Sequence, residues 1–157
     1  MPDMGFTRLN CKLILVGGKT RTTRLMRSDY WLCLHKGSTI RAYAAGRPWT
    51  KRVYVAELVV DEVWRGTGKE FQQYAQRAPH CQREGYPLLS IDEWQQRFEK
   101  LVGVQGVFEG EAYRLMVVDF TLTGGARSVG QVGCAVRHKN RGSQPAGRCS
   151  CKRQEAR

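Results

Sequence analysis

A short segment near the amino terminus concentrates side chains that could carry out chemistry. Within eight residues it holds Gly17, the amine of Lys19, the hydroxyls of Thr20 and Thr22, and the guanidinium of Arg24. Glycine lets backbone amides approach a ligand closely, and a lysine whose pKa is lowered by burial can act as a base. A threonine hydroxyl becomes a nucleophile when a base takes its proton, and arginine suits a phosphate or a carboxylate. The pattern G-x-K-T-x-T-x-R predicts a reactive or anion-binding site; the alternative is a solvated basic loop.

A second candidate segment places one aromatic ring between two cations. Trp49 lies between Arg47 and Lys51 in a stretch that also contains a proline. Aromatic rings stack on bases, and neighbouring cations contact phosphates. We therefore expect these three residues to bind substrate or RNA, whereas Trp31 and Tyr54 are expected to fill the core.

The elements around the first motif can be predicted from apolar spacing. Leu9, Leu13 and Val16 are spaced as one face of a short helix over Phe6–Val16. The pair Gly17-Gly18 has the backbone freedom with which helices commonly end. The motif is therefore predicted to form a turn after a helix.

Most of the chain after this turn has the pattern of short strands. Stretches rich in β-forming residues occur at 30–34, 40–44, 52–60 and 113–122, and glycine-containing turns separate several of them. Such a series is typical of an antiparallel meander or a small barrel.

Two helices are predicted to interrupt the strands. The first covers 69–77 and ends before Pro79. The second begins at Ser90-Ile91-Asp92-Glu93, which has the pattern of a capping box. Its predicted apolar face consists of Ile91, Trp94, Phe98 and Leu101.

Positive charge is concentrated at the two ends of the sequence. The chain has 26 Lys+Arg and 14 Asp+Glu, a net charge of +12. Residues 1–27 carry six basic residues and one acidic residue, and residues 124–157 carry eight basic residues and one acidic residue. The segment between them, 28–123, is neutral, with 12 basic and 12 acidic residues. This distribution argues against a protein that coats nucleic acid along its whole surface. We expect one domain over residues 1–123 and a basic, glycine-rich, disordered tail over 124–157.

The sequence offers no pattern for a membrane span, a secretory signal or a metal site. Apolar runs are far shorter than the ~20 residues that a spanning helix needs. Asp3, Arg8 and Lys12 interrupt any apolar leader, and the six cysteines form no CxxC pair. We therefore expect a cytoplasmic protein with free thiols, no cofactor and no metal.

Taken in order, these features resemble the ASCH domain family. The resemblance consists of a helix, the motif G-x-K-T-x-T-x-R, a strand meander and a capped helix introduced by E-G-[FY]. In this chain the later pieces are Lys36-Gly37-Ser38 before a strand and Glu84-Gly85-Tyr86 before the capping box. The resemblance covers roughly residues 6–122. Ser38 stands where many members carry Asp, so a role for an acid at that turn does not carry over.

The resemblance implies a PUA-like fold with a cleft for RNA or a modified nucleoside. The expected architecture is α+β: a small mixed barrel of about five or six strands with two or three flanking helices.

The resemblance also implies a reaction and its residues. Bacterial N4-acetylcytidine amidohydrolases within this superfamily use a lysine and a threonine from the motif and a glutamate before the late helix. By position these are Lys19, Thr22 and Glu84. The expected function is an amidohydrolase acting on an acylated cytidine. Other relatives bind RNA or cleave it, so a non-catalytic RNA-binding module and a ribonuclease remain as alternatives.

Overall fold

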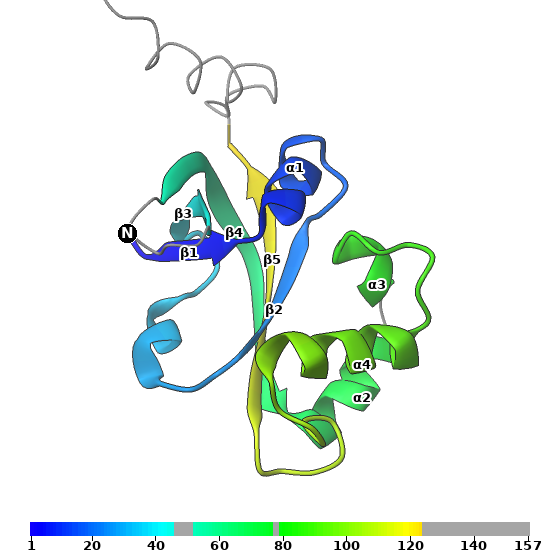
Figure 1. The fold of residues 1–157 in the computed structure, drawn as a ribbon. Coiled ribbons are helices and arrows are strands. Elements are labelled where there is room, and N and C mark those ends of the chain that lie inside the picture. The colour runs from blue at the N-terminus through cyan, green and yellow to red at the C-terminus, as the bar shows by residue number, and fades with distance from the viewer. Residues whose placement is uncertain (46–51, 77–78, 124–157) are drawn as a thin grey trace, which may run out of the picture.

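The fold is built on one mixed sheet of five strands, in the order β1-β3-β4-β5-β2 (Figure 1). The computed structural model describes residues 1–45, 52–76 and 79–123. β1 runs parallel to β3, and the other neighbouring pairs are antiparallel. The strands are β1 (Asp3–Phe6), β2 (Arg21–Leu25), β3 (Thr39–Ala44), β4 (Val53–Thr67) and β5 (Arg114–Leu122). The sheet curls into a half-barrel with helices against it, which confirms the predicted α+β class.

Strand β5 is buried on both faces because two hydrophobic cores meet on it. Met116 and Val118 point into the core enclosed by the curled sheet. Leu115 and Val117 point into a second core, between the sheet and the helices. Alternate residues of a strand face opposite sides, so both sets are apolar. This strand therefore fixes the position of the helices relative to the barrel.

Four α-helices and one 3-10 helix complete the described fold. They are α1 (Arg8–Leu15), η1 (Asp29–Cys33), α2 (Gly68–Gln76), α3 (His80–Arg83) and α4 (Ile91–Val102). The predicted capping box of α4 is confirmed: Ser90 N donates to Glu93 Oε2 at 2.8 Å, and Glu93 N donates to Ser90 Oγ at 3.2 Å. Trp94 and Phe98 of α4 stack on each other, and Trp94 also stacks on Phe71 of α2.

Two predicted elements were wrong in type. Residues 30–34 were expected to be a strand, but Asp29–Cys33 is the 3-10 helix, begun by Ser28, whose side chain accepts from Tyr30 N. A local cap thus overrides the β propensity of the aromatic residues. The turn predicted over residues 17–24 is confirmed for residues 17–20 and wrong for the rest, because Arg21–Leu25 pairs with β5 as an edge strand.

Two predicted helix faces were wrong in part. Leu9 and Val16 are 53% and 69% exposed, whereas Cys11 and Ile14 are the buried residues of α1. Helix α1 starts later than predicted, because Phe6 ends β1 and Thr7 caps the helix. Leu101 of α4 is 72% exposed.

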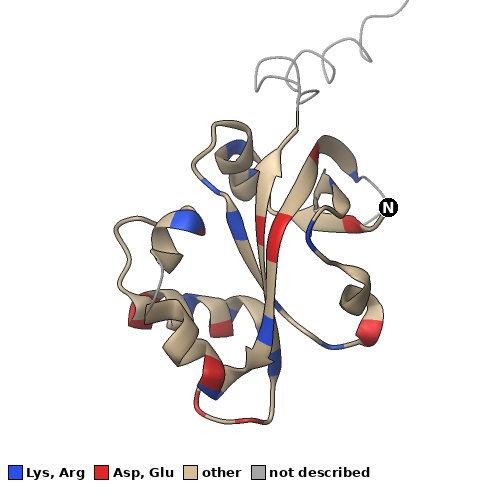
Figure 2. Cartoon of the chain, turned by 180° about the vertical axis from the view of Figure 1, so that it is seen from behind, with Lys and Arg blue, Asp and Glu red and all other residues tan. Residues whose placement is uncertain are grey.

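Both acidic and basic residues are distributed over the sheet and the helices of the described fold (Figure 2). Within residues 1–45, 52–76 and 79–123, no helix is long and apolar enough to cross a membrane. The predictions for the tail 124–157 and for Arg47, Trp49 and Lys51 fall outside the described residues.

Candidate functional site

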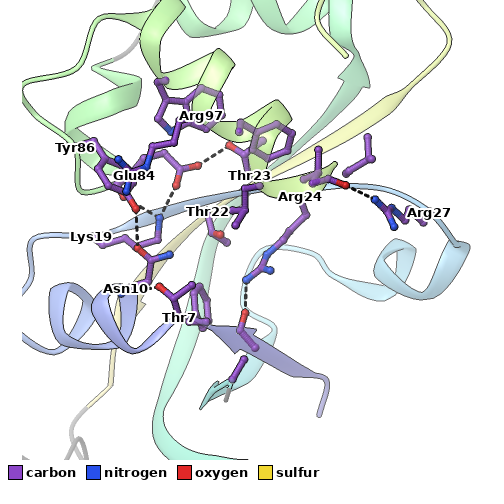
Figure 3. Close-up of a pocket in the computed structure, with 18 residues that line it drawn as sticks. Thr7, Asn10, Lys19, Thr22, Thr23, Arg24, Arg27, Glu84, Tyr86 and Arg97 are labelled. Atoms are coloured by element: carbon purple, nitrogen blue, oxygen red, sulfur yellow. Dashed lines mark hydrogen bonds and ion pairs between the residues drawn. The ribbon is translucent and has the colours of Figure 1, made fainter. Parts of the chain in front are cut away.

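A pocket of about 710 Å³ lies between the two edge strands of the sheet and helix α4 (Figure 3). Edge strand β1 contributes Phe6, and edge strand β2 contributes Thr22 and Arg24. Helix α4 contributes an apolar wall that includes Trp94 and Phe98. The open seam of the half-barrel is therefore the place where a ligand can enter.

Lys19 and Glu84 form a buried ion pair in this pocket. Lys19 Nζ lies 2.5 Å from Glu84 Oε2 and also donates to the backbone carbonyl of Glu84 at 2.8 Å. The side chains are only 2% and 5% exposed. Burial lowers the pKa of Lys19 because the charged amine loses its hydration, although the carboxylate of Glu84 opposes this shift. The structure thus places a partly desolvated amine against a carboxylate.

Backbone contacts fix the loop that carries Lys19. Gly17 follows the C-cap of α1 and has φ of 76°, the left-handed conformation that glycine adopts readily. Thr20 N donates to Arg83 O at 2.9 Å, and Phe120 N donates to Thr20 O at 2.9 Å. Neither Gly17 nor Thr20 lines the pocket. These two predicted binding residues instead hold Lys19 between α3 and β5.

Glu84 is presented by a sharp turn at the end of α3. Glu84 follows the last helical residue, and Gly85 has φ of 92°. A Cβ at Gly85 would lie 3.0 Å from Leu13 Cδ1 and 3.4 Å from Lys19 Cβ. The glycine after Glu84 is therefore required both by its dihedral angle and by the close approach of the Lys19 loop.

Two neighbouring threonines line the pocket, and they differ in their contacts. Thr23 Oγ1 donates to Glu84 Oε1 at 2.6 Å. Thr22 is 4% exposed, and in the part of the chain that the structure describes its hydroxyl has no hydrogen-bond partner. The structure thus brings the predicted Lys19, Thr22 and Glu84 to one pocket, with Thr23 as an additional contact of the carboxylate.

His80 adds a buried imidazole beside this carboxylate. Its Nε2 lies 3.9 Å from Glu84 Oε1 and has no hydrogen bond among the described residues. Arg21 Nη1 lies 3.3 Å from His80 Nδ1, and since a guanidinium only donates, Nδ1 must accept. Burial lowers the pKa of His80 to about 4, and the positive charges of Arg21 and Lys19 also lower it. His80 is therefore neutral, with its proton on Nε2, facing Glu84.

The Arg21 guanidinium is fixed in turn by an acid of the neighbouring strand. Asp119 accepts from Arg21 Nε at 2.6 Å and from Arg21 Nη2 at 2.9 Å. Arg83 Nη1 donates to Asp119 Oδ2 at 3.1 Å. Charge-assisted pairs of this kind are short and directional. A continuous polar network, buried except at Arg83, therefore joins β2, β5 and α3.

Sequence reasoning missed Thr23, His80, Arg21 and Asp119. Arg21 and Thr23 are two residues apart, and in a strand this spacing places both side chains on the same face. The segment was predicted to be a turn, so this spacing did not point to a site. Asp119 is the acid opposite Arg21 in the β2–β5 register. His80 carried no sequence signal, because its partners are distant in the chain.

Arg24 crosses the seam between the two edge strands. Its Nη2 donates to the carbonyl of Gly5 in β1 at 2.6 Å, and its guanidinium lies 5.0 Å from the centroid of Phe6. No backbone pairing joins β1 to β2, which stand at opposite ends of the sheet. A side chain thus bridges the edges and leaves room for the pocket beside it.

Comparisons with known proteins show the fold. Neither the protein-family models nor the curated proteins include a match, whereas seven solved chains match. The hypothetical protein PH0355 matches with a TM-score of 0.55 and 15% identity, over 77% of this chain and 97% of that chain. Protein EF3133 from Enterococcus faecalis V583 matches with a TM-score of 0.51 and 15% identity, over 78% and 80%. The ASCH protein from Zymomonas mobilis matches with a TM-score of 0.47 and 14% identity, over 90% and 82%.

Proposed function

We propose that this protein is an amidohydrolase that removes the acyl group from an N4-acylated cytidine. The observation that carries the proposal is the buried Lys19–Glu84 pair, which lies in one pocket with Thr22, whose hydroxyl has no hydrogen-bond partner among the described residues. An amine, a hydroxyl and a carboxylate are the groups that an acyl transfer needs. The ASCH-like motif that contains Lys19 and Thr22 supports the same reaction.

In the first step Lys19 acts as a general base toward Thr22. Lysine can accept a proton only in its neutral form, and burial of Lys19 lowers its pKa in that direction. Substrate binding brings Nζ within reach of the hydroxyl, since catalytic hydrogen bonds are often long before the substrate is bound. Thr22 Oγ then attacks the acyl carbonyl, while its proton passes to Lys19 Nζ.

Collapse of the tetrahedral intermediate breaks the bond between the acyl carbon and N4. The proton held by Lys19 passes, with Glu84 as relay, to N4 of the leaving cytidine. The acyl group then forms an ester with Thr22 Oγ. Water, activated by the same amine, hydrolyses this ester to a carboxylic acid and restores the hydroxyl. The net reaction consumes one water and yields cytidine and the acid.

The groups around Glu84 keep the carboxylate oriented for this relay. Thr23 donates to one oxygen, Lys19 to the other, and the Nε2–H of His80 faces the first at 3.9 Å. Such a fixed arrangement needs no reorganisation when the proton moves, which is the advantage of a prepared site. Thr23 and His80 are positioning residues in this scheme.

Turnover of N4-acetylcytidine by the purified chain tests the proposal directly. Chromatography of the products should show cytidine, and Lys19→Ala or Thr22→Ala should abolish its formation. Lys100→Gln, on α4 but outside the pocket, is the matched control and should keep full activity. Full activity in both pocket variants excludes this mechanism.

A second candidate is an RNA-binding module without catalysis, which is favoured by the basic side chains of the pocket. It predicts RNA affinity that falls steeply with salt and no chemical change in any acylated nucleoside. Lys19→Ala would then weaken binding without an effect on product formation, since none occurs.

A further inference from the structure

The pocket carries more positive charge than the proposed reaction requires. Among the described residues its lining contains Lys19, Arg24, Arg27 and Arg97 against one acid, Glu84, an excess of three positive charges. Glu84 is paired with Lys19, and no described carboxylate lies within 4.0 Å of the three arginines. An N4-acylated cytidine is uncharged, so the reaction alone gives these three guanidiniums no anionic partner, and among the described residues they contact only backbone carbonyls and aromatic rings.

The charges lie in a defined order along strand β2. Thr22 lines the same pocket as the Lys19–Glu84 pair, Arg24 lies two residues further along the strand, and Arg27 follows its end (Figure 3). At ~3.3 Å per residue, Arg24 is about 7 Å from Thr22 along the strand. A ligand that reacts at Thr22 and extends along β2 therefore meets Arg24 and then Arg27.

Arg27 is held in place at the far end of the pocket. Its Nη2 donates to the carbonyl of Val102, in the last turn of α4, at 2.7 Å. This bond joins the end of β2 to α4 and leaves other guanidinium donors free, since arginine has five N–H groups. Planar guanidinium groups fit the oxygens of phosphate particularly well.

We infer that the substrate carries a phosphate on its ribose, and that Arg24 and Arg27 bind this phosphate while the acylated base lies against Lys19 and Glu84. This inference rests on the proposed function and adds a substrate class to it: a nucleotide, free or within RNA, instead of a nucleoside. The apolar wall of Trp94 and Phe98 contacts the uncharged part of the ligand.

Binding of the two reaction products tests this inference without any need for turnover. Calorimetry with the full chain compares cytidine with cytidine 5′-monophosphate at low salt. We expect the nucleotide to bind about tenfold more tightly than cytidine, and Arg27→Gln to remove most of that gain, measured as the ratio of the two affinities within each variant. Lys100→Gln makes the same change of charge on α4 outside the pocket and should preserve the gain. The basic tail is present in every variant, so its contribution cancels.

Equal affinity for nucleoside and nucleotide overturns the inference. It is also overturned if Arg27→Gln and Lys100→Gln change the affinity for the nucleotide equally. Hydrolysis of N4-acetylcytidine with no preference for phosphate leaves the proposed function standing and removes only the phosphate site. A preference for the nucleotide without hydrolysis leaves the phosphate site standing and removes the proposed hydrolysis. A short cytidine-containing oligoribonucleotide then tells the sources apart: Arg27-dependent affinity equal to or above that of the mononucleotide assigns the site to RNA, and weaker affinity assigns it to free nucleotides.

Discussion

Lys19 donates to both the carboxylate and the backbone carbonyl of Glu84, a residue 65 positions later in the chain. Two segments that belong to different elements are thereby joined at one pair of side chains. Lys19 precedes an edge strand, and Glu84 ends a short helix. The backbone bond from Thr20 N to Arg83 O runs beside this pair. The contact is therefore structural as well as a candidate for chemistry, and variants must be tested for both.

Removing the amine should destabilise the fold through the carboxylate that remains. We expect Lys19→Met to lower the free energy of unfolding by about 3 kcal/mol, because a buried charge loses its partner. The double variant Lys19→Met/Glu84→Gln should cost less than the sum of the two single variants. Urea denaturation of all four proteins measures the coupling. Additive effects would show that the pair contributes little beyond its separate groups.

The activity should rise with pH through the ionisation of Lys19. A general base must be neutral, and burial places the pKa of Lys19 below its ordinary 10.5. The inflection of kcat/KM against pH should therefore lie below 10.5, with activity lost toward acid as the amine becomes protonated. Lys19→Arg should be inactive, since guanidinium keeps its proton in this range. A profile without a rising limb would contradict the role of the amine.

Acid should destabilise the protein through His80. Its pKa is lowered to about 4 in the fold and returns to ~6.5 on unfolding, so the unfolded chain binds more protons between these values. Stability is therefore complete above pH 6.5 and falls as pH decreases toward 4, by about 3 kcal/mol in total. Denaturation at pH 7 and pH 4 measures this loss of stability. The loss should be smaller in His80→Asn, which keeps an acceptor for Arg21, than in the unchanged protein. His35→Asn, an exposed control, should keep the full pH dependence.

The barrel and the capped helix could be predicted because their signals are local. The capping box at Ser90 depends on four consecutive residues, and the strand character of 113–122 depends on apolar density. The type of 30–34 was wrong because aromatic residues favour strands in general, while Ser28 caps a 3-10 helix here. Leu9 and Val16 have helical spacing, yet the buried face of α1 is the opposite one, which carries Cys11 and Ile14. Nothing in the spacing distinguishes these two faces.

The candidate site was predictable only as far as the resemblance reached. Lys19, Thr22 and Glu84 were assigned by motif, and the structure places all three at one pocket. Thr23 could not be ranked against Thr22 while the segment was expected to be a turn, because only strand pairing decides which hydroxyl faces Glu84. The contacts of His80 and Asp119 join α3 to β2 and β5 through Arg21 and Arg83, and no local pattern encodes them because the partners are distant in the chain.

Gly85 should be more sensitive to substitution than another glycine with the same kind of dihedral angle. Gly85→Ala forces an alanine into φ of 92° and brings Cβ against Leu13 and Lys19. Gly103→Ala also has positive φ, at 73°, but its Cβ meets nothing within 4 Å. We expect a loss of about 1 kcal/mol for Gly103→Ala and about 2 kcal/mol for Gly85→Ala. Only Gly85→Ala should also lower kcat, since it shifts Glu84; equal kinetics in both variants would contradict this.

The two threonines provide the sharpest test of the mechanism, because valine replaces either hydroxyl with a methyl group of similar size. Thr22→Val should lower turnover by more than about a thousandfold through loss of the nucleophile, with Thr22→Ser partly active. Thr23→Val should retain turnover at a level reduced about tenfold, because Glu84 loses one of its donors. It should also lose about 1 kcal/mol of stability, as expected for one buried hydrogen bond.

Mass spectrometry of the protein mixed with substrate locates the acyl group during this test. An acyl adduct on Thr22, absent in Thr22→Val and present in Thr23→Val, is the expected result. Active Thr22→Val together with inactive Thr23→Val would make Thr23 the nucleophile instead. The structure argues against that outcome, since the Thr23 hydroxyl already donates to Glu84 Oε1 at 2.6 Å. A hydroxyl committed to the carboxylate would have to break this bond before giving its proton to Lys19, whereas Thr22 has no such bond within the described chain.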